Sequence, residues 1–252
     1  MSTQIQEKLI TITENVPRVY DAGVAEGRSQ EWSDFWDAFQ SNGTKRSYEN
    51  AFKDWPAACF DPKYDIIGSG TYAFDQTFFR FRYVDLKAIL NKNNITIDSS
   101  QCGRLNQTFY GGSFGYEIPP LDLSNCTELF QTFGALNYDV PYVTRKITLN
   151  NLREDCVFSN PFRYSYYITE IVITGTIGQN GFDVYVFQSL RDTSITNIIN
   201  CLSDTTSGLT IQFSKVAVDK AFATTTGGTD GSTSARWNNL VATKPNWTIS
   251  LV

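Results

Sequence analysis

The chain has 252 residues, of which 41% are hydrophobic, 14% aromatic and 19% charged, a balance typical of a folded globular protein. Its net charge of -5 offers no basic surplus to neutralise phosphates, which argues against nucleic acid and anionic membranes as partners. The sequence contains no His, so His-based catalytic triads and His-ligated zinc sites are excluded.

The five cysteines are far apart in the sequence and form no C-x-x-C pair, which argues against zinc and iron-sulfur sites. Such spacing with an odd count favours buried, reduced thiols and folding in a cytoplasm. The N-terminus lacks the apolar core of a secretory signal, and no stretch of 18 apolar residues occurs. We therefore expect no membrane insertion, and no cofactor.

Residues 1–41 have the pattern of two helices. The first carries an apolar seam with the 4-3-4-3 spacing of a coiled coil, formed by Ile5, Leu9, Ile12, Val16 and Val19. Pro17 predicts a break near Asn15 and a restart, and the second helix presents an aromatic face that includes Trp32 and Phe39. A seam of two heptads is short for an isolated helix, so it predicts oligomerisation, with a homotrimer favoured, or docking on another protein. The alternative is that this helix folds back and caps its own chain.

From about residue 60 the sequence changes to short strands of alternating character, separated by turns. The expected strands are "KYDII" from Lys63, "ITID" from Ile95, "PLDLS" from Pro120, "KITLN" from Lys146, "EIVITG" from Glu170, "LTIQFS" from Leu209 and "WTISLV" from Trp247. In the middle of the chain they start about 24 to 26 residues apart, and towards the C-terminus about 38 residues apart. Periods of this size predict a solenoid.

The tripeptide "QTF" occurs three times, at residues 76–78, 107–109 and 131–133. The last two copies lie in "CGRLNQTFYG" and "CTELFQTFGA", where Cys102 and Cys126 stand in the same position. The pattern "LDLSNCTELFQTF" comes close to a leucine-rich repeat. We interpret the two cysteines as equivalent rungs and Phe109 and Phe133 as equivalent core residues. A scaffold needs translated copies whereas a catalytic residue does not, so no catalytic or metal role is assigned.

Three long segments carry a resemblance to a known family. They are "ENVPRVYDAGVAEG" with "FWDAFQSNGTKRSYENAFKDW", the unit "LDLSNCTELFQTF", and the ending "SITNIINCLSDTTSGLTIQFSKVAVDKAF" with "KPNWTISLV". Together they resemble small leucine-rich-repeat proteins with BspA-like repeats that are encoded by phages and prophages of gut and other Gram-positive bacteria. The resemblance implies a virion-associated protein and transfers no catalytic residue. The chain departs from regular repeats at Cys156, which follows Cys126 by 30 residues.

The expected fold is of the α/β repeat class, an irregular leucine-rich-repeat solenoid with N-terminal helices and a C-terminal capping unit. The expected domains are an attachment and oligomerisation segment at 1–45, the repeat array at 46–200 and the capping unit at 201–252. Towards the C-terminus we expect helices at "SITNIINCLS", with Ser194 or Thr193 as N-cap, at "KVAVDKAF" and at "SARWNNLVATKP".

Two aromatic clusters are candidate ligand-binding positions. In "FRYSYYITEIVITG" the residues Arg163, Tyr164 and Tyr166 combine a guanidinium with tyrosines expected to face outward, as in binding hot spots and sugar-stacking sites. Tyr110 and Tyr116 lie on the Gly-rich loop "TFYGGSFGYEIPP". The competing interpretation is that these side chains only pack against the core.

The function expected from the sequence is that of a non-enzymatic bacteriophage virion protein of the tail tip, a fibre or the head surface. It would display its repeats for host attachment, with other virion proteins and a host cell-surface protein or glycan as partners. The alternative is a bacterial protein-interaction scaffold or surface adhesin with the same fold.

Overall fold

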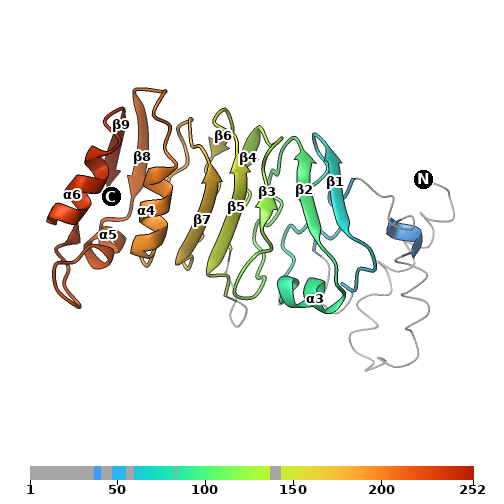
Figure 1. Cartoon of the computed structure of the whole chain (residues 1–252). Helices are drawn as coiled ribbons and strands as arrows, with labels where there is room; N and C mark the ends of the chain where they lie inside the picture. The colour runs from blue at the N-terminus through green and yellow to red at the C-terminus, as the bar shows by residue number, and fades with distance from the viewer. Residues whose placement is uncertain (1–36, 41–46, 55–59, 83, 137–142) are drawn as a thin grey trace.

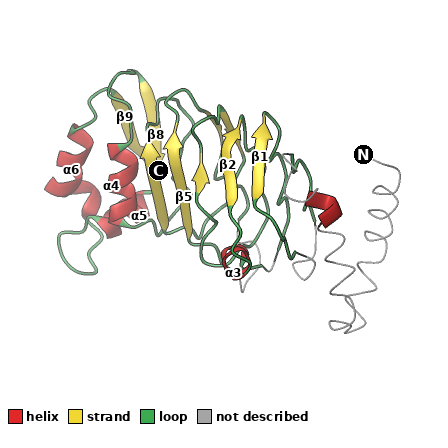
Figure 2. Cartoon of the chain, turned by 45° about the vertical axis from the view of Figure 1, so that its right-hand side comes forward, coloured by secondary structure: helices red, strands yellow, loops and turns green. Residues whose placement is uncertain are grey.

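The structure is a computed structural model, and it describes residues 37–40, 47–54, 60–82, 84–136 and 143–252. The chain progresses from one end of the molecule to the other, with β1 near the N-terminal end and β9 at the C-terminal end, where helices α4, α5 and α6 gather (Figures 1 and 2). The strands are β1 (Ile66–Gly70), β2 (Ile97–Cys102), β3 (Leu121–Asp122), β4 (Glu128–Phe130), β5 (Lys146–Leu152), β6 (Val157–Ser159), β7 (Glu170–Gly175), β8 (Leu209–Phe213) and β9 (Trp247–Leu251). The helices are α3 (Leu86–Lys92), α4 (Asp192–Asn200), α5 (Lys215–Ala221) and α6 (Ala235–Ala242), with a short 3-10 turn, η2 (Gly231–Thr233).

Every strand pairing within the described residues is parallel. β1 pairs with β2, β5 lies between β3 and β7, β4 pairs with β6, and β8 pairs with β9. In β5 the side chains of Ile147 and Leu149 are buried, and their partners in β7, Ile171 and Ile173, are buried in register with them. Parallel neighbours that repeat the same inward residues are what a stack of translated units requires.

The expected strands lie close to their predicted positions, with shifts at the N-terminal end. β5, β7, β8 and β9 begin at the predicted residues, whereas β1 and β2 begin three and two residues later than expected. Before β1, the Asp65 carboxylate accepts the N–H of Thr96 at 2.8 Å. β3 has only two residues, because the Ser99 hydroxyl of β2 accepts the Asp122 N–H at 2.9 Å and donates to the Asp122 carbonyl at 2.8 Å. A side chain thus replaces part of the strand ladder.

A five-residue turn unit recurs along one side of the stack. In each copy the first and fifth residues have a positive φ and the third is a buried Phe. Three copies of this unit contain the sequence motif "QTF". The described residues have five turn units in all, at residues 50–54, 76–80, 107–111, 131–135 and 160–164. The additional copies are spelled "NAFKD" and "NPFRY". They keep Phe at the third position and Asn, which tolerates the left-handed conformation, at the first.

Backbone hydrogen bonds join consecutive turn units into a ladder. The N–H groups of the first, third and fifth residues of one unit donate to three carbonyls, those of the residue just before the next unit and of its second and fourth residues. Gln107 donates to Phe130 at 2.8 Å, Phe109 to Thr132 at 2.9 Å, and Gly111 to Gly134 at 2.8 Å. All four junctions between the five units have these three bonds, with N···O distances of 2.6 to 3.1 Å.

Side chains of the turn units form parallel ladders. The rings of Phe109 and Phe133 stack with centroids 5.8 Å apart at 3°, and Phe78 and Phe162 extend the stack at its two ends. Gln76 donates to Gln107 at 2.8 Å, and Gln107 donates to the next glutamine at 3.1 Å. Both central Phe side chains are fully buried, in agreement with the interpretation of "QTF" as scaffold.

Three cysteines form part of the core. Cys102, Cys126 and Cys156 are fully buried free thiols, and Cys201 is a half-buried free thiol, whereas Cys59 lies outside the described residues. Burial raises the pKa of Cys102 to about 12. A hydrogen bond with Cys126, together with burial, raises the pKa of Cys156. The same hydrogen bond lowers the pKa of Cys126. Burial therefore favours the protonated, less reactive thiol at Cys102 and Cys156.

The stack changes character after β7, where helix α4 takes the place of a further strand (Figure 1). The Ser194 hydroxyl accepts the N–H of Ile171 at 2.9 Å, and the Asn197 amide both accepts from and donates to Ile173. The expected N-cap, Ser194 or Thr193, is wrong. The helix begins at Asp192 after an Arg191 cap with no side-chain cap bond, because Ser194 seals the edge of β7 instead.

Helices α5 and α6 lie where the sequence predicted them, and their N-caps are serines. The hydroxyls of Ser214 and Ser234 accept the N–H groups of Ala217 and Trp237, respectively. Helix α3 and the strands β4 and β6 were not predicted. The sequence does contain a signal for α3, an N-cap residue followed by apolar residues at helical spacing. The Asp85 carboxylate accepts the N–H of Ala88 at 2.9 Å, and Leu86 and Leu90 are buried. β4 and β6 have only three residues each.

The buried side chains from Tyr48 to Trp247 form one continuous core. The leucine-rich-repeat class and the division into segments 1–45, 46–200 and 201–252 stay predictions. The seam residues Ile5, Leu9, Ile12, Val16 and Val19 lie outside the described residues. Among the helices of the described ranges, none combines the length and apolar character needed to cross a bilayer.

Candidate functional site

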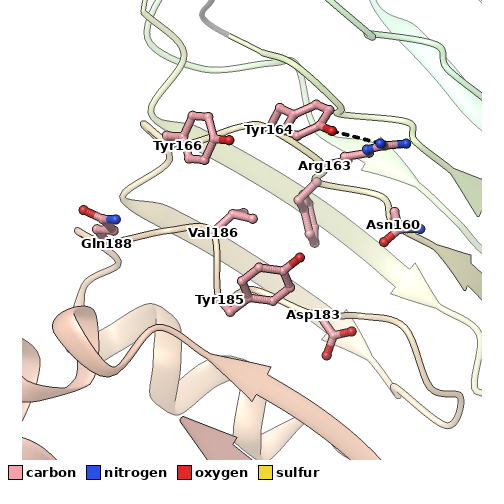
Figure 3. A pocket seen from close by; sticks show the side chains of 9 residues that line it. Asn160, Arg163, Tyr164, Tyr166, Asp183, Tyr185, Val186 and Gln188 are labelled. Atoms are coloured by element: carbon pink, nitrogen blue, oxygen red, sulfur yellow. Dashed lines mark hydrogen bonds between the residues drawn. The ribbon is translucent and has the colours of Figure 1, made fainter. Parts of the chain in front are cut away.

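A cavity of about 670 Å³ lies beside the last turn unit, between residues 160–166 and residues 183–188 (Figure 3). This volume is in the range of small-ligand sites. The residues that line it are Asn160, Phe162, Arg163, Tyr164, Tyr166, Asp183, Tyr185, Val186 and Gln188. They combine aromatic rings with amide, guanidinium and carboxyl groups.

The cavity lies where the turn-unit ladder stops. By analogy with the four preceding units, the N–H groups of Asn160, Phe162 and Tyr164 should donate to a following unit. In the part of the chain that the structure describes, none of these three N–H groups has a hydrogen-bond acceptor. All three residues line the cavity.

The following segment diverges at Gly181, which has a φ of 93°. A Cβ at this position would lie 2.4 Å from the carbonyl oxygen of Phe158, so the close approach requires glycine. Beyond it, Phe182 and Phe187 meet the ring of Phe162 edge-on, at 90° and 64°, and end the parallel Phe stack. The chain therefore covers the core but does not continue the ladder.

Three exposed tyrosines surround the opening. Tyr164, Tyr166 and Tyr185 are 48%, 52% and 42% exposed, and Figure 3 shows Tyr164 and Tyr185 on opposite sides of the cavity. The Arg163 guanidinium donates to the Tyr164 hydroxyl at 2.8 Å and lies 4.7 Å from the centre of its ring. This contact fixes one aromatic wall in place.

Asp183 supplies the carboxyl group of the cavity. One of its oxygens accepts the Gln212 N–H at 2.9 Å, and burial raises the pKa of the Asp183 carboxyl. The described part of the chain holds no cluster of three His, Cys, Asp or Glu side chains suited to a metal ion. The chemistry of the cavity is that of recognition by hydrogen bonds and ring contacts.

The structure brings together three of the five ligand-binding candidates from the sequence. Arg163, Tyr164 and Tyr166 line the cavity, and both tyrosines face outward as expected. Tyr110 and Tyr116 are not among the lining residues. The Tyr110 ring stacks on Phe79 with centroids 5.3 Å apart, and the Tyr116 hydroxyl donates to Glu170 at 2.6 Å, which raises the pKa of that tyrosine.

Sequence reasoning missed the other side of the cavity, formed by Asp183, Tyr185, Val186 and Gln188. It also missed Asn160, for which a signal existed. "NPFRY" places a polar residue two positions before Phe, as "QTF" does, but shares only the Phe with it.

No family model, no curated protein and no solved structure matches this chain.

Proposed function

We propose that this chain is a non-enzymatic attachment protein that binds a component of the host cell surface in the cavity beside residues 160–166. The observation that carries the proposal is an aromatic cavity at a break in an otherwise continuous ladder. Exposed tyrosines with nearby amide and guanidinium groups are typical of binding sites and contribute area at little cost in side-chain entropy. The virion setting, at a tail tip, fibre or head surface, rests on the sequence resemblance.

The proposal is tested by binding of the purified full chain to a panel of Gram-positive cells and isolated cell walls. The double variant Tyr166→Ala/Tyr185→Ala removes two aromatic contacts of about 0.5–1.5 kcal/mol each, and we expect its affinity to fall about tenfold. Tyr167→Ala is the matched control, because Tyr167 is 49% exposed beside the site but does not line the cavity.

Equal binding by wild type and the double variant would refute the cavity as the attachment site. Immunogold labelling of purified phage particles tests the virion setting separately. Cell binding without any label on particles would favour the bacterial surface adhesin.

A further inference from the structure

We propose that the cavity holds an extended polypeptide segment of the host-surface partner, whose backbone carbonyls continue the interrupted ladder. This inference rests on the proposed function and specifies the ligand as a protein rather than a glycan. The site comprises the N–H groups of Asn160, Phe162 and Tyr164 on one side and the side chains of Tyr185 and Val186 on the other.

The equivalent place in the four preceding turn units is already filled by polypeptide. There, carbonyls of alternate residues accept the three N–H groups, as Ser159, Pro161 and Arg163 do for the unit at 131–135, at 3.1, 2.8 and 2.6 Å. The unit at 160–164 repeats the backbone conformation of its predecessors, with φ values of 50° at Asn160 and 66° at Tyr164. Its donors are therefore placed for the same kind of acceptor.

The backbone of residues 160–163 offers donors at this end of the ladder and no unbonded carbonyl. The carbonyls of Asn160 and Phe162 accept the N–H groups of Arg163 and Ser165, and the carbonyls of Pro161 and Arg163 accept from the preceding unit. The N–H groups of the first, third and fifth residues remain without a partner in the described chain, as does the carbonyl of Tyr164 at the end of the unit. A row of acceptors at alternate positions is what an extended backbone presents, as in peptide addition to a strand edge.

A sugar hydroxyl that accepts from one of these N–H groups must also donate to a side chain such as Asp183 or Gln188, whereas a peptide carbonyl only accepts and needs no second partner. The opposite side of the cavity favours an apolar or aromatic side chain on the peptide, since Tyr185 and Val186 line it. Phe162 is 1% exposed as a residue, so an acceptor can reach its N–H only through the cavity that this residue lines.

The test uses 12-residue peptides selected from a random displayed library on the immobilised full chain and then synthesised. With ¹⁵N-labelled protein, a bound peptide should shift the amide signals of Asn160, Phe162 and Tyr164 and slow their hydrogen exchange at least tenfold. The amides of Arg163 and Ser165 should change little, because they are already bonded within the turn. This alternation is the signature of the proposed contact.

A backbone variant removes one of the three N–H donors without changing any side chain. The α-hydroxy analogue of tyrosine at position 164 replaces the backbone N–H with oxygen and should weaken peptide binding about tenfold. Tyr167→Ala should bind the peptide as wild type does. Undiminished binding by the ester variant, or amide shifts without the alternation, would overturn the proposal.

The two proposals fail in different ways. If no selected peptide binds in the cavity while cell-wall oligosaccharides bind and depend on Tyr185, the peptide inference falls and attachment through the cavity stands. If neither peptides, oligosaccharides nor cells require the cavity, both fall.

Discussion

Replacing Phe109 by Ala tests whether the repeated turn units are the scaffold of the molecule. The Phe109 ring is fully buried between Phe78, at 5.4 Å, and Phe133, at 5.8 Å, and Phe114 meets its edge at 5.3 Å. Truncating a buried Phe costs about 3–5 kcal/mol through lost burial and the cavity left behind. Because this ring contacts three others, we expect a loss of about 4 kcal/mol in the free energy of unfolding.

Urea denaturation followed by circular dichroism measures this loss. Phe109→Leu is the matched control and should lose about 1–2 kcal/mol, because it keeps most of the buried volume. The double variant Phe109→Ala/Phe133→Ala should differ from the sum of the single losses by about 0.5–1.5 kcal/mol, since the two rings stack on each other. A loss below about 1 kcal/mol for Phe109→Ala would contradict the continuous aromatic core.

Three further predictions concern the thiols, the helix beside β7 and the N-terminal seam. Denatured, never-reduced protein should show five free thiols, and folded protein at pH 8 should react slowly with a thiol reagent; three or fewer free thiols would contradict this. Asn197→Ala should cost about 1–3 kcal/mol in thermal or urea unfolding, because the buried N–H of Ile173 loses its acceptor, whereas Asn200→Ala should be nearly neutral. Leu9→Asp with Ile12→Asp should dissolve the predicted trimer while the chain stays folded; a wild type that already sediments as a monomer, with a destabilised double variant, would favour the cap interpretation.

The parts of the fold that the sequence predicts are those with strong alternation. β5 and β7 bury every second residue at their start, and both were predicted from their first residue onward. The two-residue strand β3 and the three-residue strands β4 and β6 are too short to show a period. At these places side chains such as Ser99 contribute bonds that a strand pattern does not encode.

The cavity could not be predicted from the sequence, since it depends on where a ladder ends. The residues of the unit at 160–164 resemble those of its predecessors, and only the following segment differs. There Gly181 brings the chain against Phe158, and α4 rather than a strand covers β7. The sequence shows that the spacing of the repeat changes at Cys156. It does not show that the ladder of backbone hydrogen bonds ends at the turn unit that begins four residues later, at Asn160.

The turn unit at 160–164 has the same positive φ angles as the preceding units. Within the described residues it lacks the three backbone hydrogen bonds to a following unit that stabilise this conformation in the others. Asn160 tolerates a positive φ, whereas Tyr164 at 66° is a residue type for which this conformation costs about 1–2 kcal/mol. In the preceding units three N–H bonds accompany the same conformation, and here none of the three is made within the described chain. Two contacts hold the backbone of this turn unit in place. The N–H of Arg163 donates a hydrogen bond to the Asn160 carbonyl, and the Phe162 ring is buried in the core. The three N–H donors are therefore already ordered before a ligand supplies their acceptors. Binding at this site costs less conformational entropy than binding to a flexible loop would.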